Sequence, residues 1–546
     1  GLVASLCLLP RHPRADRWWE QAKLWMFRTA TMPQDAQNLA PFAGGRTVRD
    51  LCSRAFTVLP DGTAENHYIV HPGYMSSCVV SMGRTLNTLR LYRVESPPHL
   101  YWHRRDMCEL LKPWCDDLGA LHPVQGMDWP YLSYAGKCLY HAVCNVYLED
   151  ADAALLERRA LETVERAACA HGGRMVPESL LQHCHSIQDP AIMSERAAAS
   201  LAEAYLVHRL GGQGQEPATA AAFERQVRGV HVYPHGGALL HRHAKGKTSF
   251  SWRNCTMVLP NTREGMRLVG PAMGSMLAQV TVSGQAQSAC QRAFRLREGQ
   301  DRATALLAED VCQGSVRRQV LFAALPDGRC LTAERLLALE DITVERVVQG
   351  YLEVMNDPYF GDAPDLRGRR TIYWQGGERC FLGYPAGSQE VDVELDLGDS
   401  RWVNVDDRFG VVFQGSGRAV YRNRYFFPVW HAISDALTLS LHDQPLECQA
   451  GQGVAWLVAL WCPEQLRQET SEEPLLIHER GECLAVECRG WLCAANFGEE
   501  PVPLPRRIEL TPGQPEPISA GVALRAACET TVTAALEPLE PLIVAL

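Results

Sequence analysis

The feature that most constrains the fold is a change in the hydrophobic pattern near residue 228. Before this point the chain repeats long patterns such as "SSCVVSMGRTLNTLRLY" and "GKCLYHAVCNVYLEDADAALLERRALETVERAACA", whose apolar residues recur at helical spacing. After it come short runs rich in β-branched and aromatic residues, among them "KTSFSWRNCTMVL", "RQVLFAAL" and "GVAWLVALW". Gly, Pro, Asn and Asp separate these runs, as they do between strands. A helical region is therefore expected to precede a long β region.

We predict a multidomain α+β chain, because 546 residues exceed what one hydrophobic core holds. An N-terminal α/α toroid is expected over residues 1–225, a large antiparallel β-sandwich over 228–445, and a smaller C-terminal β-sheet domain over 446–546. No fixed-period repeat is visible, which disfavours a helical solenoid. The start, "GLVASLCLLPRHPRADRWWEQAKLW", is typical of a helix end, a loop and an amphipathic helix. The toroid is therefore expected to be incomplete at its N-terminus.

Charge and composition exclude several classes of protein. The net charge of -10 argues against a nucleic-acid binder, and no apolar run has the length of a membrane span. The 20 cysteines form no CxxC pair, so zinc-ribbon and thioredoxin interpretations lack support. We interpret them as buried free thiols, which favours a reducing, cytoplasmic compartment. A secreted or periplasmic location stays open if a leader was removed. The oligomeric state cannot be derived from the sequence.

The first candidate for chemistry is the stretch "PDGTAENHYIVHPGYM", residues 60–75. Its "LPDGT" segment is a turn signal, and Pro72 suits the first position of a helix. That helix would bury Met75 and the apolar residues that follow at helical spacing. Asn66 and His67 would then lie on the loop entering the helix, with His71 beside them and Tyr74 in its first turn. Such a loop could grip a carboxylate, or it could be a structural loop whose polar groups bond the backbone.

A second candidate cluster is "YPHGGALLHRHAKGKTSFSW". On a strand, His241 and His243 point to the same face. Two neighbouring imidazoles make either half of a metal site or a base with an orienting partner. The alternative is a solvated edge strand with scattered histidines. Arg253 follows the cluster and makes the neighbourhood basic.

A third cluster, "HPVQGMDWPYLSYAGKCLYH", places Trp129, Tyr134 and Lys137 on a loop entering a helix. Aromatic rings and a cation suit a sugar ring and its carboxylate. Tyrosine is equally common in a core, so this pattern has an ordinary structural explanation as well.

The order of these motifs resembles that of the heparinase II/III-like polysaccharide lyases. "HRHAKGKTSFSW" is similar to the "HxHADxxSF" strand motif of that superfamily, with one extra residue before "SF". "PDGTAENHYIVHPGYM" is similar to a toroid segment that the hyaluronate and chondroitin lyases also carry, and "RWVNVDDRFGVVFQG" resembles a segment of their β-domain. The resemblance implies an α/α toroid followed by antiparallel β-sandwich domains.

The resemblance also implies β-elimination on an acidic, uronic-acid polysaccharide, plausible substrates being hyaluronan, chondroitin and heparan types. Asn66, with His67, matches the position that neutralises the substrate carboxylate, and His241 matches a proton-handling histidine. Tyr74 matches the acid of the hyaluronate lyases, whereas Tyr134 matches that of the heparinase-like enzymes. The remaining substrate contacts would come from His71, Trp129, Lys137, His243 and Arg253. Relatives carry Gly-Arg where this chain has Gly136-Lys137, and lysine lacks the planar fork of arginine.

No cofactor is expected to be required. His243 matches a position that binds a structural divalent metal in some relatives, but the Asp-Pro-Gly segment that follows there is not evident after "SFSWRN". Two alternatives to a lyase stay open. A glycoside hydrolase would need two carboxylic acids, for which Asp61, Glu65 and Asp128 are available. A non-catalytic protein that binds acidic glycans needs neither carboxylates nor a base.

Overall fold

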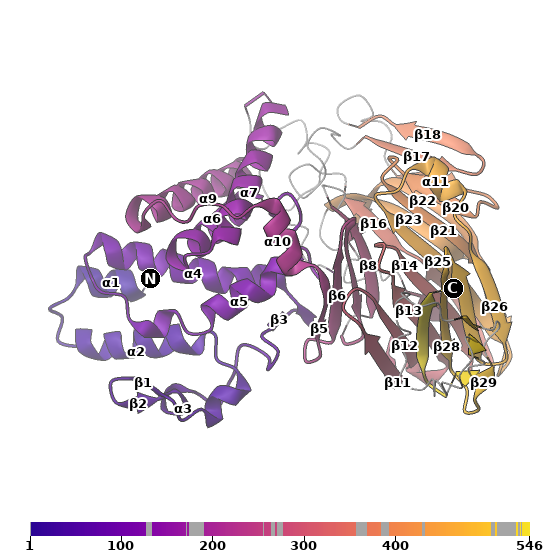
Figure 1. Cartoon of the computed structure of the whole chain (residues 1–546), viewed down its shortest axis with the longest axis horizontal. Helices are drawn as coiled ribbons and strands as arrows, with labels where there is room; N and C mark the ends of the chain where they lie inside the picture. The colour runs from indigo at the N-terminus through magenta and orange to yellow at the C-terminus, as the bar shows by residue number, and fades with distance from the viewer. Residues whose placement is uncertain are drawn as a thin grey trace. The chain divides into compact units, whose positions relative to one another are not determined.

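The computed structural model describes most of the chain as two compact units. The first holds Gly1–Val227 and Val232–Ala238, and the second holds Arg228–His231, Leu239–Asn356 and Leu366–Leu546. Helices dominate the first unit and strands the second (Figure 1), which confirms a mixed α and β chain with several sheets. The described residues are 2–126, 134–170, 172–173, 190–254, 256–263, 268–269, 277–355, 369–383, 392–427, 432–503, 508–509, 531–532, 535–536 and 538–545.

The first unit is built from helices joined by turns and two short hairpins. Its helices are α1 (Leu2–Leu8), α2 (Ala15–Arg28), α3 (Val48–Leu51), α4 (Pro72–Leu91), α5 (Arg104–Leu111), α6 (Tyr134–Tyr147), α7 (Ala151–Ala170), α9 (Pro190–Gly211) and α10 (Ala220–Val227). The hairpins pair β1 (Pro41–Ala43) with β2 (Arg46–Thr47) and β3 (Glu65–Asn66) with β4 (Ile69–Val70). Within the described ranges, no helix combines the length and the apolar character that a bilayer span needs.

Helix α4 begins where the sequence predicts. Pro72 occupies its first turn, where a missing N–H costs nothing, and the His71 side chain caps it by accepting the Gly73 N–H at 3.1 Å. The helix buries a stripe of apolar side chains that faces the rest of the unit; these are Met75, Val79, Met82 and Leu86. At Gly83 a Cβ would collide with the Val143 side chain. Only glycine therefore allows α4 to pack so closely against α6.

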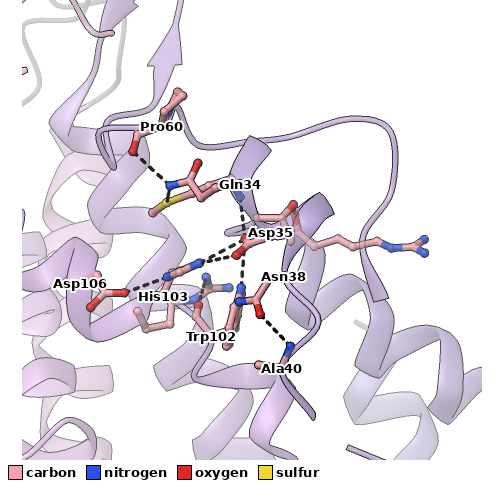
Figure 2. Close-up of polar contacts among 12 residues, drawn as sticks. Gln34, Asp35, Asn38, Ala40, Pro60, Trp102, His103 and Asp106 are labelled. Carbon is pink, nitrogen blue, oxygen red and sulfur yellow. Dashed lines mark hydrogen bonds and ion pairs between the residues drawn. The ribbon is translucent and has the colours of Figure 1, made fainter. Parts of the chain in front are cut away.

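A buried carboxylate joins the segment after α2 to the start of α5 (Figure 2). Asp35 Oδ2 accepts the Met32 N–H at 2.9 Å and the Trp102 indole N–H at 3.2 Å. The imidazole of His103 lies between two carboxylates, with Nε2 3.1 Å from Asp35 Oδ1 and Nδ1 2.8 Å from Asp106 Oδ2. Asp35 is almost fully buried whereas the Asp106 side chain is largely exposed. The connection therefore depends on Asp35.

Two large antiparallel sheets form the centre of the second unit. Among the described residues, the nine-stranded sheet has the order β11-β12-β13-β14-β25-β21-β20-β17-β18. These strands are β11 (Ala289–Glu298), β12 (Ala303–Val311), β13 (Val316–Ala324), β14 (Cys330–Ala338), β25 (Gly453–Pro463), β21 (Phe409–Gly415), β20 (Trp402–Val405), β17 (Arg370–Trp374) and β18 (Gly377–Phe381). The eight-stranded sheet contains β9 (Leu268–Val269), β10 (Gln279–Val282), β15 (Ile342–Gln349), β16 (Leu352–Met355), β19 (Val393–Asp396), β22 (Arg418–Phe427), β23 (Ala432–His442) and β24 (Leu446–Cys448).

Smaller sheets flank these two. One four-stranded sheet has the order β26-β27-β28-β33, with strands β26 (Leu476–Arg480), β27 (Cys483–Cys488), β28 (Trp491–Asn496) and β33 (Pro541–Ala545). Another has the order β5-β6-β7-β8, with strands β5 (Gly229–Tyr233), β6 (Ala238–His243), β7 (Gly246–Ser251) and β8 (Met257–Thr262). Two-stranded pairs join β29 (Val502–Pro503) to β32 (Ala535–Leu536) and β30 (Ile508–Glu509) to β31 (Thr531–Val532). Strands of the nine-stranded sheet bury apolar side chains on both faces, because the eight-stranded sheet packs on one face and the β26–β28 sheet on the other.

The expected division between residues 445 and 446 falls inside this sheet system. Strand β24 pairs with β15 of the eight-stranded sheet, and β25 pairs with both β14 and β21 near the middle of the nine-stranded sheet. The segment up to residue 463 thus completes the large sheets, and the separate C-terminal sheet begins only at β26. Side-chain periodicity cannot show which sheet a strand joins, because the alternation of apolar and polar residues is the same in either sheet.

Replacing Asp35 by alanine is expected to lower the free energy of unfolding by about 2–3 kcal/mol, because buried donors lose their acceptor. Urea unfolding followed by circular dichroism measures this. Asp106→Ala is the matched control: it removes the exposed partner of the same imidazole and should cost less than about 0.5 kcal/mol. Equal losses in the two variants would contradict the dependence on Asp35.

Candidate active site

The loop that the sequence singles out folds as a two-residue hairpin in front of α4. Asn66 pairs with Ile69 across β3 and β4, and His67 and Tyr68 form the turn with φ of +53° and +68°. Such turns normally use Asn-Gly, because only small residues adopt positive φ cheaply. Non-glycine residues in the left-handed region store strain and are found preferentially at functional sites. Tyr68 is 87% exposed, so core packing does not explain it.

Asn66 has a buried amide oxygen at this hairpin. Its Oδ1 is buried and has no hydrogen-bond partner in the part of the chain that the structure describes. Most buried polar atoms in proteins are paired, so each exception calls for an explanation. A ligand group that donates a hydrogen bond to Oδ1 is one such explanation.

Two imidazoles flank the ring of Tyr74 in the first turn of α4. The ring centroids of His67 and Tyr74 lie 5.7 Å apart and those of His71 and Tyr74 lie 4.8 Å apart, both in edge-to-face geometry. Tyr74 is 43% exposed, so its ring reaches solvent. His71 is buried and its Nδ1 caps the helix, which gives this residue a structural task.

The hairpin is held by a residue that the sequence did not single out. Gln125 is fully buried; its Oε1 accepts the Val70 N–H at 2.7 Å, and its Nε2 donates to Gly236 O at 2.7 Å. Asp61 holds the turn that contains Gly236, because its Oδ2 accepts the N–H groups of His235 and Gly236 at 2.7 and 2.9 Å. Gln125 lies 55 residues from Val70 and 111 from Gly236, so no local sequence pattern predicts these bonds.

The second helix of the site is α6. Lys137 is buried, and its Nζ lies 3.5 Å from the Ser76 Oγ of α4, which places this ammonium beside the first turns of α4. Tyr134 is the first residue of α6, and its side chain is outside the described part of the structure. Trp129 lies outside the described residues altogether.

A cavity of about 690 Å³ adjoins Tyr74 between α1, α2 and α4. Trp25, which is 58% exposed, lies on its wall. Hydroxyl groups from one face of α4 line it as well, including those of Ser77, Ser81 and Thr85. Most of the lining is nevertheless apolar, and the Ser77 and Thr85 hydroxyls donate to the backbone carbonyls of Gly73 and Ser81, so this cavity does not by itself indicate a sugar.

His241 and His243 lie in the second unit, on β6. Their ring centroids are 5.1 Å apart, as expected for two residues on one face of a strand. The prediction of a solvated edge as the alternative is wrong, because every residue of β6 is buried and β6 lies between β5 and β7. Arg253, two residues beyond β7, is exposed.

Burial determines the charge of both imidazoles. It lowers the pKa of His241 to about 4, and nearby Arg228 and His231 lower it further against the opposing effect of Asp301. Burial also places the pKa of His243 well below its ordinary value. The Nδ1 of His241 has no hydrogen-bond partner in the described structure, whereas the Nδ1 of His243 accepts the Lys245 N–H at 3.2 Å. His241 is therefore a neutral imidazole with an unused nitrogen.

The residues predicted from the sequence thus fall into two groups. The first unit brings together Asn66, His67, His71 and Tyr74, with Lys137 on the neighbouring helix; the second unit holds His241, His243 and Arg253. Among the described residues, no three His, Cys, Asp or Glu side chains gather as metal ligands would.

No protein-family model matches this chain, and no curated protein matches its sequence. Its structure is similar to that of Streptomyces coelicolor A3 chondroitin AC lyase in complex with chondroitin sulphate, with 11% identity and a TM-score of 0.41 over 90% of this chain and 71% of the other. It is also similar to heparinase III, with 8% identity and a TM-score of 0.43 over 89% and 64%. A mutant of the heparan sulfate lyase HepC from Pedobacter heparinus is similar as well, with 8% identity and a TM-score of 0.43 over 90% of this chain and 64% of the other. The chain thus spans about two thirds of the length of these structures, and the likeness assigns no role to any residue.

Replacing Gln125 by alanine is expected to destabilise the first unit by about 2–3 kcal/mol, because Val70 N–H and Gly236 O both lose buried partners. Gln125→Glu is the matched comparison, since it keeps an acceptor for Val70 but loses the donor to Gly236. Amide hydrogen exchange at Val70 should accelerate in the alanine variant and stay closer to wild type in the glutamate variant. Unchanged exchange in both variants would show that Gln125 does not hold the hairpin.

The low pKa of His241 predicts a loss of stability in acid. The unfolded imidazole takes up a proton near pH 6.5, whereas the folded one does so only near pH 4. Between these values the unfolded chain binds more protons, so stability falls as the pH falls, by up to about 3 kcal/mol. Urea unfolding at several pH values from 7 to 4 should show a shallower decline in His241→Gln, where this group is absent. Identical declines would contradict the assignment.

Proposed function

We propose that this chain is a polysaccharide lyase that cleaves a uronic-acid polysaccharide by β-elimination. The observation that carries the proposal is the buried Oδ1 of Asn66, which has no hydrogen-bond partner in the described structure, in the residue that precedes His67, whose ring contacts that of Tyr74. An α/α toroid followed by β-sandwich domains is the architecture that we propose for it. The likeness to chondroitin and heparan sulfate lyases is consistent with an acidic polysaccharide as the substrate.

The reaction begins by neutralising the substrate carboxylate. The C5 proton of a uronate is weakly acidic, because its removal places negative charge on a group already charged. An asparagine amide carries an acceptor and two donors, so it can pair with both oxygens of a protonated carboxyl group. The carboxylate would take up a proton from water as it binds; Asn66 Oδ1, which is unpaired in the described structure, would accept that O–H while the amide N–H donates to the second oxygen. His67 supports the neutralised group from the adjoining turn.

Proton transfer needs a base for C5 and an acid for the leaving glycosidic oxygen. Tyr74 is partly exposed and lies against two imidazoles, so it is our candidate for the acid in the first unit. Tyr134 is the alternative, at the start of α6. His241 is the proposed second proton-handling group: burial keeps its imidazole neutral, so one ring nitrogen carries no proton, and the same burial lowers its strength as a base.

The remaining residues of the proposed set would bind the sugar. Lys137 supplies a cation beside α4, although it pairs with carboxylates without the fork of arginine. His71, His243, Arg253 and Trp129 complete the proposed set. No cofactor is part of this proposal, and a divalent metal beside His243 is not part of it either.

A glycoside hydrolase is less well supported. Asp61 was one of its candidate acids, but both of its oxygens accept hydrogen bonds, Oδ2 from two backbone N–H groups and Oδ1 from the Thr63 N–H and hydroxyl at 3.2 and 2.7 Å. A carboxylate that holds the backbone is poorly placed to protonate a leaving group. Glu65 is engaged in contacts as well, and Asp128 lies outside the described residues. A non-catalytic glycan-binding protein stays the other alternative.

Asn66→Ala and His241→Ala are each expected to lower kcat on a uronate polysaccharide by at least about a thousandfold, with folding intact by circular dichroism. Absorbance of the unsaturated product in the ultraviolet measures turnover and separates a lyase from a hydrolase. Asn38→Ala is the control for the amide, because Asn38 Oδ1 only caps the Ala40 N–H. Full activity in Asn66→Ala and His241→Ala would refute this site.

Tyr74→Phe tests whether Tyr74 is the acid. It should lower kcat and leave KM nearly unchanged, because it removes the hydroxyl without changing the ring. Tyr92→Phe at the other end of α4 is the control, since the two tyrosines are equally exposed, at 43% and 45%. If Tyr74→Phe stays active while Tyr134→Phe does not, Tyr134 is the acid.

A further inference from the structure

A second cavity, of about 870 Å³, lies entirely within the second unit. The loop between β19 and β20 forms one wall, with Asp396, Asp399 and Arg401, and the turn between β21 and β22 forms another. Trp456 of β25 and Gln414 of β21 also line it. Its lining is mostly polar, so it suits a hydrophilic ligand better than an apolar one.

The cavity is preformed, because the turn beside it is tightly bonded. Ser416 N–H donates to Trp456 O at 3.0 Å, and Trp456 N–H donates to Ser416 Oγ at 3.0 Å. At Gly417 a Cβ would lie 2.7 Å from Leu441 N, so the backbone of the turn fits directly against β23. A ligand that binds here meets a rigid surface and orders little of the chain.

Trp456 provides an aromatic surface in this cavity. It packs against the core cluster of the nine-stranded sheet and yet is only partly buried, so part of the indole stays available to a ligand. An indole combines a large apolar face with a polar N–H. A sugar ring has the complementary pattern, with C–H groups on its faces and hydroxyl groups around its edge.

The charges around Trp456 limit the ligand further. Arg418 is already held between Glu394 and Asp443, at 2.8 and 2.7 Å. In the described part of the chain, no ion pair or hydrogen bond engages the side chains of Asp399 and Arg401, and both residues are exposed. Arg401 can thus pair with one carboxylate, while Asp399 can accept hydrogen bonds from hydroxyl groups and repels further anions.

We propose that this cavity is an accessory binding site for a uronate oligosaccharide of low charge, with one carboxylate per disaccharide and no sulfate. The sugar stacks on Trp456, its carboxylate pairs with Arg401, and its hydroxyl groups donate to Asp396 and Asp399. A heavily sulfated chain is excluded because its sulfates would meet those two carboxylates. The site would hold a long polysaccharide to the protein between cleavage events, and that part of the inference rests on the proposed function.

Binding is measured by isothermal titration calorimetry on the full chain carrying Asn66→Ala, so that cleavage does not consume the ligand. The probes are hexasaccharides of hyaluronan, heparin and the neutral glucan maltohexaose. We expect the hyaluronan hexasaccharide to bind, and the heparin and glucan hexasaccharides to bind at least about tenfold more weakly. Equal affinity for all three, or binding of none, would overturn the proposal.

Charge variants at exposed positions locate the site without disturbing the core. Arg401→Glu should weaken the affinity for the hyaluronan hexasaccharide about tenfold, and Asp399→Lys should strengthen it and admit the heparin hexasaccharide. Arg295→Ala, an exposed arginine on β11 of the same unit, is the control and should change nothing. Unchanged affinity in both Arg401→Glu and Asp399→Lys would refute the site.

The kinetic readout separates this proposal from the proposed function. In a chain with Asn66 intact, Arg401→Glu should raise the KM for long hyaluronan and leave kcat on a tetrasaccharide unchanged. If the chain cleaves no uronate glycan but binds the hyaluronan hexasaccharide through Arg401, the proposed function fails and the accessory site stands. If it cleaves the polymer and Arg401→Glu alters neither KM nor binding, only the accessory site fails.

Discussion

The candidate site depends on a pair of buried hydrogen bonds made by one glutamine. Gln125 accepts the Val70 N–H and donates to Gly236 O, and Asp61 accepts the N–H groups of His235 and Gly236. Between these anchors the chain forms a hairpin whose turn puts His67 and Tyr68 at positive φ. A strained turn persists only where its surroundings hold it. The position of Asn66 therefore follows from residues that take no part in chemistry.

Burial affects a different polar group in each unit. Around Asn66 it removes water from an amide oxygen that has no hydrogen-bond partner among the described residues. Around His241 it disfavours the charged form of the imidazole and keeps the ring neutral. Both effects come from the cost of placing a polar or charged group in a medium of low dielectric constant. The cavity in the second unit differs, because its Asp399 and Arg401 are exposed to water.

Part of the site could be predicted from the sequence because its signals are local. Pro72 and the apolar spacing after it predicted α4, and alternation on a strand predicted that His241 and His243 share a face. The support from Gln125 and Asp61 could not be predicted, since each bonds backbone groups far away in the sequence. The burial of β6 was also missed, because two histidines and an arginine in six residues are typical of an exposed strand.

The sequence by itself determined the order of helices and strands, the start of α4 and the chemical types available in each motif, because these depend on neighbours within a few residues. Only the tertiary structure decided which sheets the strands join, as β24 and β25 show by completing the two large sheets. It also decided which polar atoms stay unpaired and which histidines lose their charge. Those properties depend on burial, and burial is set by contacts between segments that the sequence does not place together.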